Sequence, residues 1–127
     1  MALEWEQVVV DSADPAALAR WWADVLGWVV VNDEDGEYEI RPAPDRMPGL
    51  LFLAVPEKKT VKNRLHLDFR PTDHEAEVQR FLSAGARRVD VGQGDDATWV
   101  TLGDPEGNEF CILRSRGVPS GQTAASD

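Results

Sequence analysis

The chain has a single cysteine, two histidines and one tyrosine among its 127 residues. With Cys111 alone, no disulfide can form within the chain, and a reducing cytoplasm fits this composition. Two histidines leave few options for a Ser/His/Asp triad, and no phosphate-cradling glycine loop is evident. No apolar run approaches the roughly 20 residues that span a bilayer, and no secretory signal pattern opens the chain. The sequence therefore predicts a cytoplasmic protein without membrane segments.

Positive charge is also scarce, because the chain has 13 basic and 23 acidic residues, which give a net charge of −10. This balance repels nucleic acid and anionic membranes, so neither is an expected partner. It favours a cationic ligand, although ordinary solubility explains it equally well. Hydrophobic residues make up 43% of the chain, which is enough for a globular fold of one domain.

Two stretches of the chain repeat the same pattern at a fixed distance. Each has a strand-like run, then an aspartate, then a helical run that ends at glycine. His66 follows Gln7 by 59 residues, and Asp73 follows Asp14 by the same 59 residues. A period this long indicates a duplicated supersecondary unit, whose equivalent polar side chains can converge on one cleft.

The first half reads as one helix and four strands. The expected strands cover residues 4–10, 28–31, 37–41 and 50–55. Asp14 predicts a helix start, since its side chain caps free N–H groups and Pro15 is tolerated at the first helical position. Gly27 predicts the helix end. The 37–41 stretch alternates like an exposed strand.

The second half repeats this order. Its expected strands cover residues 64–70, 87–91, 98–102 and 109–113. A helix begins at Pro71-Thr72-Asp73, where Thr72 and Glu75 form a capping box. A turn is expected at 92–96, and the small, polar stretch 117–127 predicts a flexible tail.

The two halves together predict an α+β fold made of two βαβββ modules. Module one covers residues 4–56 and module two residues 63–114, within a single domain at 4–114. A sheet that curves around the two helices brings eight strands into an open, barrel-like trough.

This order and several sequence motifs resemble the vicinal oxygen chelate superfamily, and most closely its glyoxalase-like subgroup. The superfamily includes glyoxalase I, bleomycin-resistance proteins, fosfomycin-resistance enzymes and extradiol dioxygenases. The motifs are Asp14-Pro15 before Leu18-Ala19-Arg20-Trp21-Trp22, then Val25-Leu26-Gly27, then Asn63-Arg64-Leu65-His66-Leu67-Asp68, and finally Asp104-Pro105-Glu106-Gly107-Asn108-Glu109-Phe110. The resemblance covers residues 4–114 and implies a homodimer that acts on a small molecule.

The resemblance also implies a metal site, because family ligands lie on the first and last strands of each module. Carried over, they fall on Gln7, His66 and Glu109. The fourth position falls near Leu51 or Phe52, and neither side chain can bind a metal. Such a mixed ligand set suits Zn, Mn, Ni, Fe or Co, and Glu109 can also act as a catalytic base. The alternative is a metal-free site in which these polar side chains hydrogen-bond one another or water.

Alternation along the 64–70 strand places His66, Asp68 and Arg70 on one face. The other face carries Leu65, Leu67 and Phe69 and is expected to meet the helix layer. Asp68 and Arg70 are candidates for binding the polar end of a substrate, with a wall ion pair or exposed charges as the alternative.

Tryptophans at strand positions, Trp5, Trp28 and Trp99, can stack on a planar or cationic ligand, or else pack in the core or a subunit interface. His74 follows the second helix cap and is expected to be solvated. Cys111 is expected to share a face with Glu109 and to act in packing, not as a nucleophile.

Three functions follow from these observations. The first is a metal-dependent lyase, isomerase or oxygenase that acts on a small molecule with adjacent oxygens. The second is a metal-free protein that sequesters a small compound, as bleomycin-resistance proteins do. The third is a non-catalytic domain of a regulatory assembly, which no residue supports directly. Fold alone does not decide among them.

Overall fold

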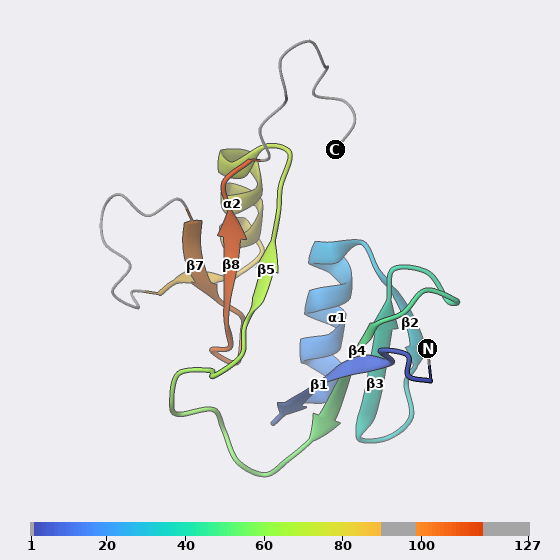
Figure 1. The fold of residues 1–127 in the computed structure, drawn as a ribbon. Helices are drawn as coiled ribbons and strands as arrows, with labels where there is room; N and C mark the ends of the chain where they lie inside the picture. The colour runs from blue at the N-terminus through green and yellow to red at the C-terminus, as the bar shows by residue number, and fades with distance from the viewer. Residues whose placement is uncertain (1, 90–98, 116–127) are drawn as a thin grey trace. The chain divides into compact units, whose positions relative to one another are not determined.

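The computed structural model describes residues 2–89 and 99–115, which form two compact units that divide after Thr60 (Figure 1). Unit 1 holds β1 (Gln7–Ser12), α1 (Pro15–Leu26), β2 (Val29–Asn32), β3 (Glu37–Arg41) and β4 (Gly49–Ala54). Unit 2 holds β5 (Leu67–Phe69), α2 (His74–Ser83), β6 (Arg87–Arg88), β7 (Trp99–Gly103) and β8 (Glu109–Leu113). The α+β class and the two βαβββ modules are confirmed. The predicted turn at 92–96 and tail at 117–127 lie outside the described residues.

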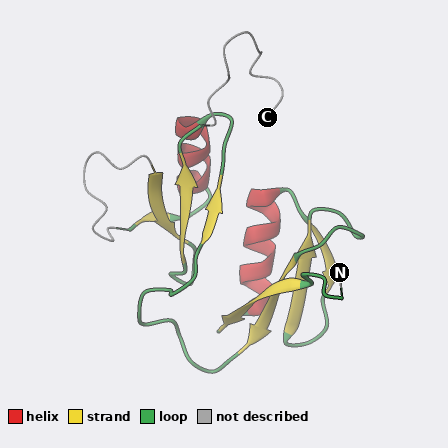
Figure 2. Cartoon of the chain, viewed as in Figure 1, coloured by secondary structure: helices red, strands yellow, loops and turns green. Residues whose placement is uncertain are grey.

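Each unit folds its strands into one four-stranded sheet with a helix packed on it (Figure 2). The strand order is β1-β4-β3-β2 in unit 1 and β5-β8-β7-β6 in unit 2. In both units the first strand pairs in parallel with the last, and the remaining pairs are antiparallel. Each sheet is open, because its two edge strands do not pair with each other. The joining of the two sheets into one trough stays a prediction.

The helix caps follow the repeat. The Asp14 side chain accepts the Ala17 N–H at 3.2 Å, and Gly27 ends α1 with a φ of 68°, a left-handed conformation that glycine adopts without strain. In α2 the predicted Thr72–Glu75 capping box is wrong. Asp73 is the cap, since its carboxylate accepts the Ala76 N–H at 3.1 Å. Neither of these two helices has the length and apolarity needed to cross a bilayer.

The strand predicted to be exposed in unit 1 is instead partly buried. β3 lies between β2 and β4, so both of its edges are paired. Ile40 is fully buried, and Glu39 retains only 8% of its exposure. The prediction that the alternating 37–41 strand is exposed is therefore wrong, because a central strand can bury a charged side chain that has a partner.

The core of unit 2 lies between its sheet and α2. Phe110 is 1% exposed, and its ring contacts those of Phe81 and Phe69, with centroids 5.4 and 6.1 Å away. Figure 1 shows α2 lying along β8, the strand that carries Phe110. Leu65 was predicted to share this apolar face but is 88% exposed, because β5 begins only at Leu67.

Candidate functional site

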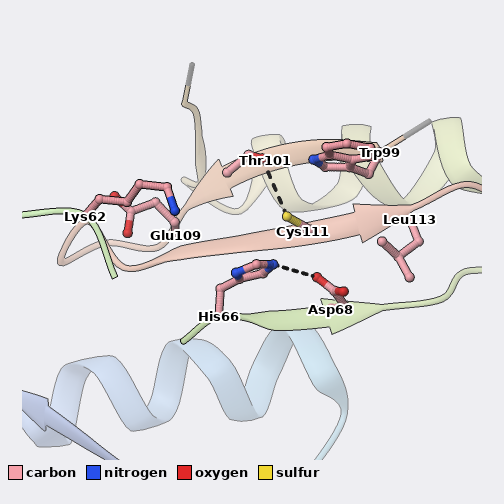
Figure 3. A pocket seen from close by; sticks show the side chains of 8 residues that line it. All are labelled: Lys62, His66, Asp68, Trp99, Thr101, Glu109, Cys111 and Leu113. Carbon is pink, nitrogen blue, oxygen red and sulfur yellow. Dashed lines mark hydrogen bonds and ion pairs between the residues drawn. The ribbon is translucent and has the colours of Figure 1, made fainter. Parts of the chain in front are cut away.

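Unit 2 contains a pocket of about 430 Å³ on the sheet (Figure 3). Its lining comes from β5, β7, β8 and the segment that leads into β5. The lining residues are Lys62, His66, Asp68, Trp99, Thr101, Glu109, Cys111 and Leu113. The pocket thus gathers a histidine, two carboxylates, a thiol and an indole within one unit.

Strand alternation and register explain this gathering. Glu109, Cys111 and Leu113 face the pocket from β8, while Phe110 and Ile112 are buried in the core, as the sequence predicts. In the sheet, Cys111 is paired with Asp68 on one side and with Thr101 on the other. Three strands therefore place a carboxylate, a thiol and a hydroxyl in one row across the pocket wall.

His66 is the residue just before β5, two residues before Asp68, and it also lines the pocket. Its Nε2 is 3.1 Å from Asp68 Oδ1, and about half of each side chain is exposed. Figure 3 shows the ring and the carboxylate pointing toward one another, with Cys111 on the neighbouring strand. A carboxylate in this place fixes the orientation of the imidazole ring.

Glu109 opens β8 and anchors the segment before β5. Its carboxylate accepts the backbone N–H of Asn63 at 2.9 Å, and the Asn63 side chain donates to the Glu109 carbonyl at 3.4 Å. Lys62 lines the same pocket (Figure 3). Glu109 therefore enters the pocket with a defined position.

Cys111 is buried, and its Sγ shares a hydrogen bond of 3.5 Å with Thr101 Oγ1. Burial raises the pKa of the Cys111 thiol above its ordinary value, and the negative charge of Asp68 acts in the same direction. A thiol that stays protonated is a weak nucleophile, which agrees with the prediction that Cys111 is not one.

The sequence did not predict a second feature of Cys111. The ligand atoms of His66, Asp68 and Cys111 all lie within 4.8 Å of one another. The spacing of His66 and Asp68 indicated their shared face, and alternation placed Cys111 with Glu109. The missing information was the register between β5 and β8, which brings Asp68 and Cys111 directly opposite each other.

The other candidate residues are not among those that line this pocket. Gln7 begins β1 and Trp28 precedes β2, both half-buried in unit 1, where Trp5 is largely exposed. Arg70 follows β5 and donates to the Arg114 carbonyl at 3.0 Å, outside the lining of the pocket. Roles for Gln7, Trp28 and Arg70 stay predictions.

His74 was predicted to be solvated, and this is wrong. It is half-buried, and its Nδ1 donates to the Leu113 carbonyl at 2.7 Å. Its backbone N–H donates to Ser115 Oγ at 2.9 Å. His74 therefore ties the start of α2 to the end of β8 and takes no part in the pocket.

Register also corrects the position of the missing fourth ligand. Val8 pairs with Leu50 in unit 1 as Leu67 pairs with Phe110 in unit 2, so the counterpart of Glu109 is Gly49. Leu51 and Phe52, the predicted counterparts, lie further along β4. Gly49, like Leu51 and Phe52, has no side-chain atom that could bind a metal.

The space beside Gly49 is filled by an ion pair. A Cβ at Gly49 would lie 2.6 Å from Glu39 Oε2. That carboxylate binds Arg41 Nε at 2.8 Å, and Glu6 contacts Arg41 Nη2 at 3.2 Å. The hydrogen bond to Glu39 raises the pKa of the Arg41 guanidinium. Unit 1 thus has a structural ion pair at the place where unit 2 has the Glu109 carboxylate, which accepts the Asn63 N–H.

The donor set of the pocket suits a transition metal. His66 supplies a nitrogen, Asp68 and Glu109 supply carboxylate oxygens, and Cys111 supplies sulfur. Zinc takes all three donor types, and imidazole also suits iron, nickel and copper. The same groups can bind a cationic or polar organic molecule, with Trp99 as an aromatic wall.

Solved structures share this fold at low sequence identity. A glyoxalase/bleomycin resistance protein/dioxygenase family enzyme from Burkholderia phytofirmans PsJN has a TM-score of 0.68 at 18% identity, covering 90% of this chain and 100% of that chain. The bleomycin resistance determinant encoded on transposon Tn5 has a TM-score of 0.61 at 17% identity, covering 91% and 100%. Glyoxalase I of Leishmania major has a TM-score of 0.65 at 10% identity, covering 89% and 87%. At these identities the likeness shows the fold.

No curated protein sequence matches the chain significantly. A family model for the glyoxalase-like domain, however, matches residues 7–113, which is most of the chain. The order of elements, the sheet topology and the closing turn before β8 agree with this match. The chain belongs to the glyoxalase-like domain family of the vicinal oxygen chelate superfamily.

Proposed function

We propose that the chain is a metal-dependent enzyme of the lyase, isomerase or oxygenase type that acts on a small molecule with adjacent oxygens. The observation that supports this proposal is that His66 and Glu109, two ligands predicted from the sequence, line one pocket of unit 2. Gln7 of unit 1 is the proposed third ligand. Zn, Mn, Ni, Fe and Co are the candidate ions.

Four of the pocket residues have defined tasks in this proposal. A divalent ion held by His66 and Glu109 would supply Lewis acidity toward the paired oxygens of the substrate. Asp68 keeps the imidazole of His66 in place through their 3.1 Å contact. Glu109, when displaced from the ion, acts as the base that accepts a substrate proton, and the Asn63 N–H holds one of its oxygens in position. Trp99 covers the organic part of the substrate, with Trp28 and Arg70 as further proposed contacts.

Metal analysis of the purified protein tests this proposal. We expect a near-stoichiometric divalent ion in the wild type and its loss in His66→Ala. His74→Ala is the matched control, because it removes the other histidine, which the structure places outside the pocket. Absence of binding to all five candidate ions in calorimetric titrations would refute the metal-dependent proposal.

A metal-free binding protein is the second candidate. One observation favours it: His66 and Glu109 both have protein partners, Asp68 and the Asn63 N–H, without any ion. Two carboxylates beside an indole would attract a cationic aromatic compound. Quenching of tryptophan fluorescence by such compounds, lost in Trp99→Phe, would support it. No response in the wild type to a panel of cationic aromatics would count against it.

The assembly and location of the protein belong to the same proposal. We expect a homodimer in the cytoplasm, with the thiol of Cys111 reduced. Size-exclusion chromatography with light scattering measures the first property directly, and a mass of one chain would contradict it.

A further inference from the structure

We propose that His66, Asp68 and Cys111 form a binding site for a thiophilic divalent ion of the zinc class. This site differs from the predicted ligand set, because Asp68 and Cys111 replace Glu109 as partners of His66. The inference goes beyond the proposed function, revises its ligand set, and shares His66 and Asp68 with it. It needs neither Gln7 nor catalysis.

The geometry of the three side chains supports this site. Their ligand atoms lie within 4.8 Å of one another, and His66 Nε2 is already 3.1 Å from Asp68 Oδ1. Ligand atoms around a tetrahedral zinc lie about 3.3–3.8 Å apart, given bonds of about 2.0–2.3 Å. Small side-chain rotations therefore bring the three atoms to bonding distance without movement of the backbone.

The positions of these residues in the sheet hold the site together. Asp68 and Cys111 are directly opposite each other on β5 and β8, so hydrogen bonds between the strands fix their separation. His66 is two residues before Asp68 and faces the same pocket. A site that rests on paired strands keeps its geometry better than a site on loops.

The donor chemistry selects the class of ion. One sulfur, one imidazole nitrogen and one carboxylate oxygen suit zinc or cobalt and disfavour magnesium or calcium, which prefer oxygen ligands. Thr101 Oγ1 lies 3.5 Å from the sulfur and is placed to hydrogen-bond the bound thiolate. Three protein ligands leave a fourth position, and the pocket provides room for a water or substrate oxygen there.

Glu109 has a different role in this arrangement. It also lines the pocket, but its carboxylate accepts the Asn63 N–H and is not a member of the three-residue cluster. With the ion on the cluster, Glu109 stays uncoordinated and available as a base. The two ligand sets can therefore be separated by substituting Glu109 and Cys111 in turn.

Titration of the full-length, reduced protein with Co²⁺ tests the inference. A cobalt–thiolate bond produces a charge-transfer band in the near ultraviolet that oxygen and nitrogen ligands do not produce. We expect this band in the wild type, its loss in Cys111→Ser, and its retention in Glu109→Gln. Asp68→Asn should retain the band with about tenfold or more weaker binding, since even the partners of metal ligands contribute about 10–100-fold in affinity.

The outcomes separate the two ligand sets. Cobalt binding without the thiolate band, together with loss of binding in Glu109→Gln, would overturn the inference and leave the proposed function standing. No cobalt binding at all would overturn the inference, whereas the proposed function is refuted only when none of its five candidate ions binds. Because Cys111 is buried and Cys111→Ser can disturb folding, the exposed Asp68→Asn variant provides a second test. Wild-type affinity in Asp68→Asn would also overturn the inference.

Discussion

The two units share one scaffold but differ in the residues they present on it. Both pair their first strand in parallel with their last, and both cap their helix with an aspartate, Asp14 or Asp73. At corresponding strand positions, however, unit 1 has Gln7 and Gly49 where unit 2 has His66 and Glu109. The scaffold is thus repeated, while most of the candidate chemistry lies in unit 2.

A second difference lies on the neighbouring strand. Register makes Glu39 the counterpart of Thr101, since they pair with Leu51 and Cys111 in the same way. In unit 1 the Glu39 carboxylate binds Arg41 and fills the space beside Gly49. In unit 2 the small Thr101 leaves room, and the pocket forms there. The position without a side chain in unit 1 therefore coincides with a structural ion pair, whereas the corresponding position in unit 2, Glu109, lines the pocket.

The largest expected effect tests whether unit 2 has its own core. Phe110→Ala removes a 1% exposed ring that contacts Phe69 and Phe81, and should lower the free energy of unfolding by about 3–5 kcal/mol. Urea denaturation followed by circular dichroism measures it. Leu65→Ala is the control, since Leu65 is 88% exposed and its loss should cost less than about 0.5 kcal/mol. Equal losses in the two variants would contradict this description of the core.

A smaller effect tests the difference at the missing ligand position. In Gly49→Ala the new Cβ meets Glu39 Oε2 at 2.6 Å and the Ile40 carbonyl at 3.0 Å, so we expect a loss of about 1–3 kcal/mol in stability. The matched change in unit 2 is Glu109→Ala. It creates no such clash and should cost about 1 kcal/mol for the hydrogen bond from Asn63. A Gly49→Ala protein as stable as wild type would show that Glu39 does not occupy this space.

The helix starts offer a further comparison. Pro15 is the first residue of α1, whereas His74 is the first residue of α2 and bonds the Leu113 carbonyl through its ring. His74→Ala should therefore reduce stability by about 0.5–1.5 kcal/mol, measured as a lower urea midpoint. Metal binding should be unchanged, because His74 lies outside the pocket. An unchanged midpoint would mean that this hydrogen bond does not stabilise unit 2.

The smallest effect is a change in reaction rate and concerns Cys111, whose counterpart in unit 1 is Leu51. The raised pKa means that less thiolate is present at pH 8 than for an ordinary cysteine, so alkylation by iodoacetamide should be slow and should accelerate as pH rises. Asp68→Asn should speed the reaction, since the Asp68 charge helps to raise this pKa. Protein unfolded in urea is the control. Folded and unfolded protein reacting at the same rate at pH 8 would contradict the prediction.

Local signals in the sequence predicted the scaffold well. The Asp14 and Gly27 caps and the alternation along β8 depend on neighbours within a few residues, and the structure confirms them. The repeat between the two halves is a long-range pattern, but it can be read directly from the order of these local signals, and the matching topology of the two units confirms it. The Thr72 cap failed because Asp73, one residue later, offers a stronger acceptor at the same helix end.

The site was harder to predict, because it depends on pairing between distant strands. Alternation alone placed Glu109 with Cys111 and His66 with Asp68. It could not align the two strands, so the cluster of His66, Asp68 and Cys111 was missed. The burial of Glu39 was missed for a similar reason, since the central place of β3 in its sheet is a property of the whole unit.

The most direct test of the central claim, that His66 anchors a metal site on the sheet of unit 2, is an anomalous difference map from crystals soaked in Zn²⁺. We predict a peak within bonding distance of the His66 imidazole, with Asp68 and Cys111 as its neighbours. A map with fully occupied zinc peaks at other positions and no peak at His66 would contradict the claim.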